Sequence, residues 1–118
     1  MSVPEKESSA PAVAQAERRH FPRHTVQVQV ELKQEGSDVP MRLTTTDLSR
    51  NGCYVEMMVP LSVGIRVQAT LWLDGERVVT RGCVVTRHPQ FGNGIMFLEF
   101  EGDGEEGLKK YLESINNE

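Results

Sequence analysis

The chain has 118 residues, which is the length of a single domain with one modest hydrophobic core, and it excludes a TIM barrel or a dinucleotide-binding domain joined to a substrate domain. With 13 Lys and Arg against 17 Asp and Glu, the formal net charge is −4. General DNA or RNA binding is therefore disfavoured, because proteins of that class usually carry a basic surplus, whereas a local basic cluster for one compact anion remains compatible with the charge.

The N-terminal residues 1–17 are rich in Pro, Ser, Ala, Gln and Glu and contain no aromatic residue. Such a segment buries too little apolar area to offset its ordering entropy, so we expect a disordered tail. It also lacks the apolar core of a signal peptide, and no run approaches the roughly 18 apolar residues of a membrane span. We expect a cytoplasmic protein without membrane insertion, with one domain over residues 18–118.

The composition changes at residues 18–24, Arg-Arg-His-Phe-Pro-Arg-His, where three arginines lie close together. The Phe-Pro pair restricts the backbone, so this is not simply a flexible charge run. Guanidinium groups bind phosphate, recognise the O6/N7 edge of guanine and stack on flat rings. The candidate ligand-binding residues here are Arg18, Arg19 and Arg23. The alternative is a basic linker that pairs with surface acids.

Strict alternation of apolar and polar residues predicts a first, half-buried strand over 26–32. Gly, Ser, Asp and Pro in 34–40 indicate a turn, and a Thr-rich second strand is predicted over 41–48. Residues 49–52, Ser-Arg-Asn-Gly, predict a tight turn in which the Asn-Gly pair supplies positive φ. A third strand is expected over 53–58, followed by a loop.

A fourth strand is predicted where alternation returns, with Trp72 on the face opposite to Val67, Ala69, Leu71 and Leu73. Asp74-Gly75 indicates a hairpin to a fifth strand over 76–87. Gly82 within that strand indicates a bend or bulge, as a sheet needs when it curls into a barrel. A sixth strand is predicted over 95–100.

The C-terminus changes from strand to helix periodicity. An apolar stripe at i, i+3, i+4 and i+7 predicts an amphipathic helix over about 104–116, made by Leu108, Tyr111, Leu112 and Ile115. We expect this helix to pack over an open end or face of the sheet. The sequence therefore predicts an all-β fold, a six-stranded antiparallel β-barrel with one C-terminal α-helix.

No catalytic motif accompanies the three histidines, His20, His24 and His88, so we expect no enzyme and assign no catalytic residue. A metal site built from His20, His24, Cys53 and Cys83 would have suitable ligand atoms, but the spacing matches no known pattern, so no metal or cofactor is expected. The two cysteines lie in apolar surroundings and are interpreted as buried free thiols.

A second polar motif, Asp47-x-Ser49-x-x-Gly52, lies at the junction of the second and third predicted strands. An ionised carboxylate can accept hydrogen bonds from the N1/N2 edge of guanine, a serine hydroxyl can bind a base or a phosphate, and Gly52 permits close approach of a ligand or of backbone. The alternative is an ordinary turn in which Asp and Ser cap their own backbone.

Taken together, Arg19-His-Phe-Pro-Arg23 and Asp47-Leu-Ser49-Arg-Asn-Gly52 resemble the signature of the PilZ domain, the bacterial receptor module for the second messenger cyclic di-GMP. Residues 92–97 resemble the closing strand of that family. The resemblance covers about residues 17–100, and none of the five signature positions departs from the family pattern.

The resemblance implies roles for the two motifs. Arg19 and Arg23 would grip phosphates and a guanine Hoogsteen edge. Asp47 and Ser49 would read guanine and support the loop, while Gly52 would leave room for the ligand.

Further arginines follow from the same resemblance. Arg18 resembles family members that bind a stacked, intercalated pair of ligand molecules, and Arg87 lies where some members place another contact. Arg50 and Arg81 are weaker candidates, because exposed arginines are ordinary on barrel surfaces.

The implied function is a stand-alone cyclic di-GMP receptor and adaptor. Residues 18–24 would become ordered over the barrel on binding and signal to an unidentified protein partner, with motility, polysaccharide secretion, biofilm formation or virulence as output. One alternative is a PilZ-fold interaction scaffold that binds no nucleotide. Another is a small barrel for single-stranded nucleic acid, which the 6 % aromatic content and negative charge disfavour.

Overall fold

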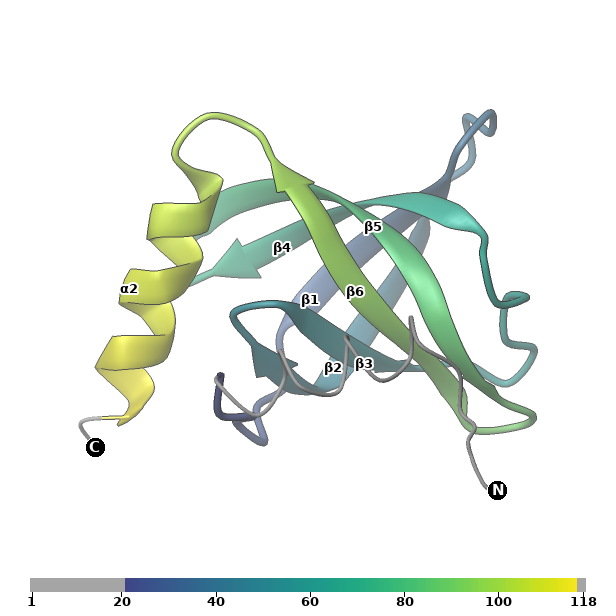
Figure 1. The fold of residues 1–118 in the computed structure, drawn as a ribbon, viewed down its shortest axis with the longest axis horizontal. Helices are drawn as coiled ribbons and strands as arrows, with labels where there is room; N and C mark the ends of the chain where they lie inside the picture. The colour runs from purple at the N-terminus through teal and green to yellow at the C-terminus, as the bar shows by residue number, and fades with distance from the viewer. Residues whose placement is uncertain (1–20, 117–118) are drawn as a thin grey trace, which may run out of the picture.

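The computed structural model describes residues 21–116, which form six strands and one helix (Figure 1). The elements are β1 Gln29–Gln34, β2 Met41–Ser49, β3 Gly52–Glu56, β4 Arg66–Leu73, β5 Glu76–His88, β6 Gly92–Phe100 and α2 Gly104–Asn116. Neighbouring strands are antiparallel in the order β1-β2-β3-β6-β5-β4, and pairing of β1 with β4 closes the barrel. The predicted all-β barrel with one C-terminal helix is confirmed.

The core is filled by the alternating apolar residues of the strands. On β4, the four predicted inward residues are at most 3 % exposed, namely Val67, Ala69, Leu71 and Leu73, whereas Trp72 is 41 % exposed. Period-two alternation thus separates the barrel interior from its outer surface, as a strand requires.

Two predicted backbone features of the β4–β5 region are confirmed. Asp74 and Gly75, between β4 and β5, both have positive φ, at 52° and 86°. This is the conformation of a tight two-residue hairpin that matches the strand twist. Further along β5, the register with β6 shifts between Arg81 and Gly82, so the glycine marks a bulge.

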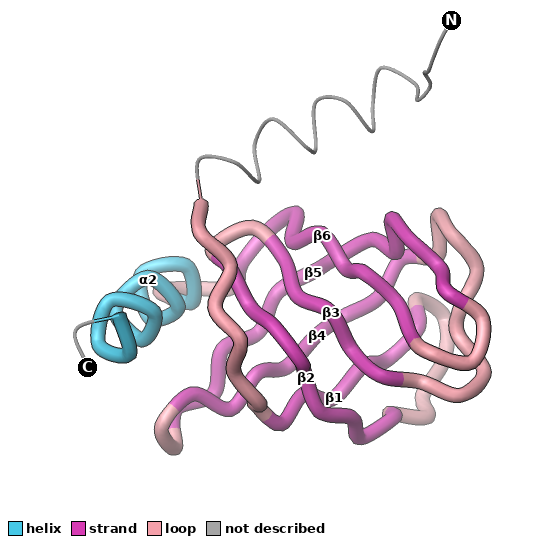
Figure 2. Tube along the Cα trace, turned by 90° about the horizontal axis from the view of Figure 1, so that it is seen from below, coloured by secondary structure: helices cyan, strands magenta, loops and turns pink. Residues whose placement is uncertain are grey.

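Helix α2 packs against one end of the barrel (Figures 1 and 2). Leu108 and Leu112 are almost fully buried and belong to the barrel core cluster, while Tyr111 and Ile115 are half-buried against it. The helical apolar stripe therefore covers the barrel end, as expected. Within residues 21–116, no helix is both long and apolar enough to cross a membrane.

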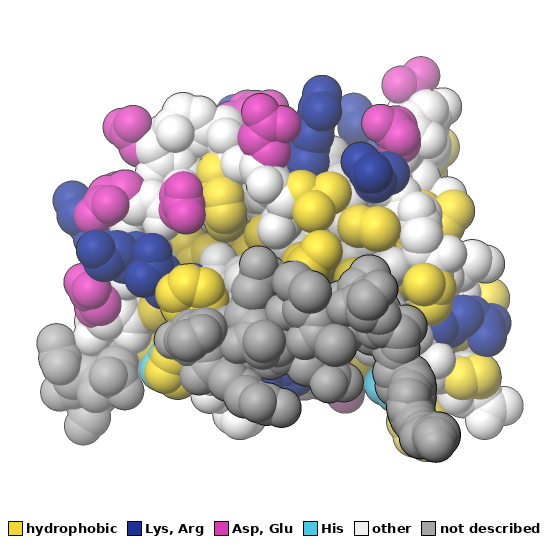
Figure 3. Space-filling model, in the orientation of Figure 1, with side chains coloured by type: hydrophobic (Ala, Val, Ile, Leu, Met, Phe, Trp, Pro, Cys, Tyr) yellow, Lys and Arg dark blue, Asp and Glu magenta, His cyan; other side chains and the backbone are white. Residues whose placement is uncertain are grey.

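Charged side chains of both signs alternate over α2 on the face drawn in Figure 3, while apolar side chains lie exposed over the barrel. On this face, acidic side chains are thus interspersed with basic ones rather than gathered into one acidic patch.

Some element boundaries differ from those predicted. β1 begins at Gln29 instead of residue 26, because the Val26 carbonyl and the Val28 amide are bonded to the Thr45 side chain, which interrupts the regular strand ladder. β3 ends at Glu56, before the expected residue 58. β6 begins at Gly92, before the expected residue 95, because the backbone of Gly92 packs closely on Val55 and pairs with Glu56. The predicted tail over 1–17 lies outside the described residues.

Candidate functional site

The segment ahead of β1, residues 21–28, is called the arm here and lies beside β2 (Figure 2). His24 and Leu48 exchange two backbone hydrogen bonds of 2.9 Å. The fully buried Thr45 hydroxyl donates to the carbonyl of Val26 at 2.8 Å and accepts from the amide of Val28 at 3.0 Å. The arm is therefore fixed to the barrel from His24 onward.

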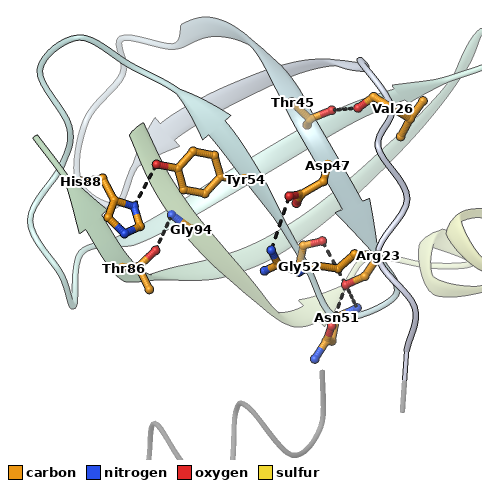
Figure 4. Close-up of polar contacts among 11 residues, drawn as sticks. Arg23, Val26, Thr45, Asp47, Asn51, Gly52, Tyr54, Thr86, His88 and Gly94 are labelled. Atoms are coloured by element: carbon orange, nitrogen blue, oxygen red, sulfur yellow. Dashed lines mark hydrogen bonds and ion pairs between the residues drawn. The ribbon is translucent and has the colours of Figure 1, made fainter. Parts of the chain in front are cut away.

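Arg23, one residue before this anchor, contacts Asp47 across the two sequence motifs (Figure 4). Its Nη1 lies 3.4 Å from Oδ2 of Asp47, and the two side chains are 42 % and 26 % exposed. The other carboxylate oxygen, Oδ1, is buried and accepts no hydrogen bond from the residues that the structure describes. Asp47 therefore holds acceptor capacity that a donor could use.

A β-bulge sets the direction in which Asp47 points. Thr45 faces the core, so regular alternation would place Asp47 in the interior as well. The register of β2 with β3 shifts between these two residues, which pairs Asp47 with the outward-facing Tyr54. The extra residue thus turns the carboxylate to the outer surface, a known use of bulges beside functional sites.

The outer face of the barrel beside Asp47 carries no side chain at two positions, because two glycines lie there on neighbouring strands. Tyr54 of β3 pairs with Gly94 of β6, and Gly52 of β3 pairs with Met96. Gly52 and Gly94, called the glycine floor here, thus occupy diagonal positions of this face. Arg23 and Met96 help to line a small hollow of about 10 Å³ over it, which is no larger than about one water molecule and cannot enclose a ligand. Such a surface suits a ligand that lies flat rather than one enclosed in a pocket.

Gly52 is required by a close approach of backbone, not by its φ. A Cβ at this position would overlap with the carbonyl oxygen of Ile95. The expectation that Asn51-Gly52 supplies positive φ was wrong, since neither residue has it. The turn instead continues the pairing of β3 with β6, because the carbonyl of Asn51 accepts a 2.8 Å hydrogen bond from the amide of Phe97.

Ser49 stabilises the turn itself. Its side chain is buried, and its Oγ lies 2.7 Å from Oδ1 of Asn51 and 3.3 Å from the carbonyl oxygen of Gly52. It also accepts a hydrogen bond from the backbone amide of Asn51 at 3.3 Å. These contacts match the capping alternative for Ser49, whereas Asp47 pairs with Arg23 instead of capping its own backbone.

Arg87 lies near the C-terminal end of β5, and its sequence position is distant from both Arg23 and Asp47. Its Nε donates a hydrogen bond to the carbonyl of Pro60 at 3.4 Å. The loop that contains Pro60 is held by Asn93, which is fully buried. The Asn93 side chain accepts from the amide of Leu61 at 2.8 Å and donates to its carbonyl at 2.9 Å. Arg87 is thus attached to a well-anchored loop.

The two weaker arginine candidates have other partners. The guanidinium of Arg50 lies 4.8 Å from the centre of the Phe21 ring, a cation–π distance, and so holds the start of the arm. Arg81 lies 3.9 Å from Glu99 in an exposed ion pair on β5 and β6. Arg18 and Arg19 lie outside the described residues, so the structure places only Arg23 of the three clustered arginines.

The cysteines are both free, but only Cys53 is fully buried, while Cys83 is half-buried. Burial, with a smaller contribution from the Asp47 charge, raises the pKa of the Cys53 thiol to about 12. The thiol therefore stays protonated at neutral pH. Among the described residues, no group of three His, Cys, Asp or Glu side chains is arranged to hold a metal ion.

Sequence reasoning missed two residues of this face, Tyr54 and His88. The phenol oxygen of Tyr54 lies 2.9 Å from Nδ1 of His88, and the bond crosses from β3 to β5 above Gly94 (Figure 4). The spacing offered one signal, since Tyr54 follows Gly52 by two residues and must share its face of the strand. Nothing in the sequence pointed to His88 as its partner.

Comparison with known proteins identifies the fold family. The model of the PilZ domain family matches residues 17–114. The PilZ domain of CeSA from a cellulose-synthesizing bacterium has a TM-score of 0.66 and 21 % identity, over 80 % of this chain and 98 % of that chain. No curated protein matches the chain significantly.

The inhibitor of motility MotI/DgrA of Bacillus subtilis has a TM-score of 0.67 and 16 % identity, over 86 % of this chain and 52 % of that one. This chain thus spans about half the length of that protein, and at these identities both structures show a shared fold alone. The family match is broader evidence, because it includes the arginine segment, the whole barrel and most of α2. The chain belongs to the PilZ domain family.

Proposed function

We propose that the protein is a receptor for cyclic di-GMP that binds the ligand on the outer face of β2, β3 and β6, beside the arm. PilZ domains form a receptor family for this messenger, which supports the proposal. The observation that carries it is the contact between Arg23 and Asp47, 24 residues apart, which brings the two signature motifs together next to the glycine floor.

Binding would exchange the partners of this ion pair. A ligand phosphate offers Arg23 a bidentate contact, which is stronger than its present single 3.4 Å contact with Asp47. Release of Arg23 costs little, since ion pairs this exposed contribute about 0–1 kcal/mol. The freed carboxylate of Asp47 would then turn to bring its buried Oδ1 to the surface, and its two oxygens would accept the N1–H and N2–H donors of a guanine.

The remaining motif residues would act around this exchange. Ser49 would keep the turn in shape through its bonds to Asn51, and Gly52 would allow the close approach of β3 to the Ile95 carbonyl beside the site. Arg19 would bind a phosphate together with Arg23, and Arg18 would stack on guanine or reach a second phosphate of an intercalated ligand pair. Arg87 is proposed as a further contact, at the cost of its bond to Pro60.

The arm would carry the signal. Because His24 is already paired with Leu48, the part that rearranges is the chain before His24, a narrower segment than the expected 18–24. A change there would alter the surface that an unidentified protein partner contacts in the cytoplasm. The names of the similar structures, an inhibitor of motility and a domain from a cellulose-synthesizing bacterium, support motility or polysaccharide production as outputs.

The test is isothermal titration calorimetry with cyclic di-GMP, with GTP and cyclic di-AMP as competitors. Wild type is expected to bind selectively, Arg23→Ala to lose at least tenfold in affinity, and Arg81→Ala to bind like wild type. Arg81 is a matched control, because it is another exposed arginine paired with an acid. A binding stoichiometry near two ligands per chain would support the role of Arg18 in binding an intercalated ligand pair.

The alternative function is a PilZ-fold interaction scaffold that binds no nucleotide. An absence of heat with wild type at high ligand concentration would favour this scaffold and overturn the receptor proposal. Equal affinity of wild type and Arg23→Ala would keep a nucleotide receptor but remove the proposed site.

A further inference from the structure

Tyr54 and His88 form an aromatic pair on the outer face of the barrel. Their ring centres are 5.7 Å apart with an angle of 40° between the planes, and the Tyr54 oxygen lies 2.9 Å from Nδ1 of His88. Tyr54 is half-buried and His88 is exposed, so both rings are open to a ligand at the surface.

The pair borders the glycine floor on the side of Gly94. Gly94 pairs directly with Tyr54 and has no side chain, so the phenol can cross it towards β5 (Figure 4). A Cβ at Gly94 would overlap with the hydroxyl of Thr86 on β5. The missing side chain at Gly94 therefore leaves room for the Thr86 hydroxyl, which accepts a 3.0 Å hydrogen bond from the Gly94 amide beside the two rings.

Tyr54 is also the direct neighbour of Asp47. The two residues are paired across β2 and β3 on the same face, and Cβ atoms of such pairs lie about 4.5–5.5 Å apart. Partial burial and the charges of Asp47 and Glu56 raise the pKa of the Tyr54 phenol, so it remains neutral at physiological pH. A planar base bonded to Asp47 would lie within contact distance of the phenol ring.

We propose that Tyr54 is a ligand-contacting residue whose ring packs against the purine held by Asp47, and that His88 is a positioning residue that holds this ring through the 2.9 Å bond. The inference rests on the proposed function. It adds an aromatic wall to the arginine and carboxylate contacts, and it gives a planar base a preference over a bare phosphate or sugar.

The bond to His88 explains why the ring would be ready for the ligand. An unattached phenol at the surface samples several rotamers, and the loss of this freedom on binding opposes affinity. The contact with His88 fixes the ring before the ligand arrives. A purely structural pair would stabilise the barrel and leave affinity unchanged.

The affinity of cyclic di-GMP should be measured calorimetrically for Tyr54→Ala, Tyr54→Phe, His88→Ala and His88→Asn, after thermal unfolding has shown that each variant folds. Stacking of a base on an aromatic ring contributes about 1–3 kcal/mol, so Tyr54→Ala should weaken binding about 5- to 150-fold. Tyr54→Phe keeps the ring and should lose less. Trp72→Ala, an exposed aromatic residue on β4 at the opposite side of the barrel, should bind like wild type.

The role of His88 is separated by rescue and by a double variant. His88→Asn places an amide near the position of Nδ1 that can either donate to or accept from the phenol, and it should restore most of the affinity that His88→Ala loses. If His88 acts only through its bond to the phenol, the double variant Tyr54→Phe, His88→Ala should bind as well as the single variant that has the lower affinity. A further loss in the double variant would overturn the positioning role.

Failure of this inference differs from failure of the proposed function. If wild type binds and Tyr54→Ala binds equally well, the aromatic wall is wrong while the receptor stands. If wild type shows no binding, the receptor proposal itself fails, and the wall fails with it.

Discussion

Thr45 donates a 2.8 Å hydrogen bond to the carbonyl of Val26 and so fastens the arm to β2 from inside the barrel. The same hydroxyl accepts from the amide of Val28, and it is fully buried. This side chain thereby supplements the one backbone hydrogen bond between β2 and Val28, from the Thr45 amide to the Val28 carbonyl at 2.9 Å. The position of Arg23 above Asp47 follows from this anchor.

Thr45→Val keeps the shape of the side chain but removes both hydrogen bonds to the arm. Because the amide of Val28 is buried and would lose its partner, we expect a loss of about 1–3 kcal/mol in unfolding free energy. Urea denaturation measures the change. Thr44→Val, on the exposed face of the same strand, is the control and should change stability little. An unchanged midpoint for Thr45→Val would contradict its anchoring role.

Arg23→Ala should separate binding from stability. The Arg23–Asp47 pair is long and partly exposed, and such pairs contribute about 0–1 kcal/mol. The thermal midpoint should therefore move by a few degrees at most in the same protein that loses the ligand. A large drop in the midpoint would mean that any binding defect reflects unfolding of the arm.

Two glycine substitutions should change stability in opposite directions. Gly52→Ala drives a methyl group into the Ile95 carbonyl, so the strands must separate, and overpacking of this kind costs about 1–3 kcal/mol. Gly107→Ala, in α2, meets only ordinary contact with Val78 at 3.5 Å and should stabilise by up to about 1 kcal/mol through helix propensity. Chemical denaturation of both variants tests the pair, and a stabilised Gly52→Ala would refute the close approach.

Cys53 should make the fold less stable at alkaline pH. Burial raises its folded pKa to about 12 from an ordinary value of 9.0, so between these values the unfolded chain has lost a proton that the folded chain retains. The unfolding free energy then falls as pH rises above 9, by at most about 1.4 kcal/mol per pH unit. Denaturation at pH 8 and pH 10 measures the slope. Cys53→Ala should reduce it, and an equal slope in the variant would show that other groups cause it.

The strand and helix pattern was largely predictable from the sequence. Alternation in β4 and the helical spacing of Leu108 and Leu112 each place apolar residues on one side, and burial of that side decides the fold. The boundaries were less predictable where a side chain competes with the backbone. Nothing local in the sequence reveals that Thr45 would occupy the hydrogen-bonding positions opposite Val26 and Val28.

The candidate site depended on long-range features that alternation alone does not contain. Simple alternation places Asp47 on the face of Thr45, inside the barrel, and only the bulge between them turns its carboxylate outward. Tyr54 and His88 are 34 residues apart in the chain, and their bond forms only because β3 and β5 both pair with β6. Arg23 could be identified because the phosphate-binding chemistry of an arginine follows from its residue type alone. Its contacts, by contrast, depend on the fold.

Closure of the sheet by β1 and β4 also limits how the barrel can associate with other proteins. Each of the six strands has a neighbour on both sides, so their backbone N–H and C=O groups offer no open edge on which a foreign strand could be added. Recognition of the barrel must therefore proceed through side chains, loops and the arm. The same closure protects the β-rich chain against edge-to-edge aggregation at high concentration.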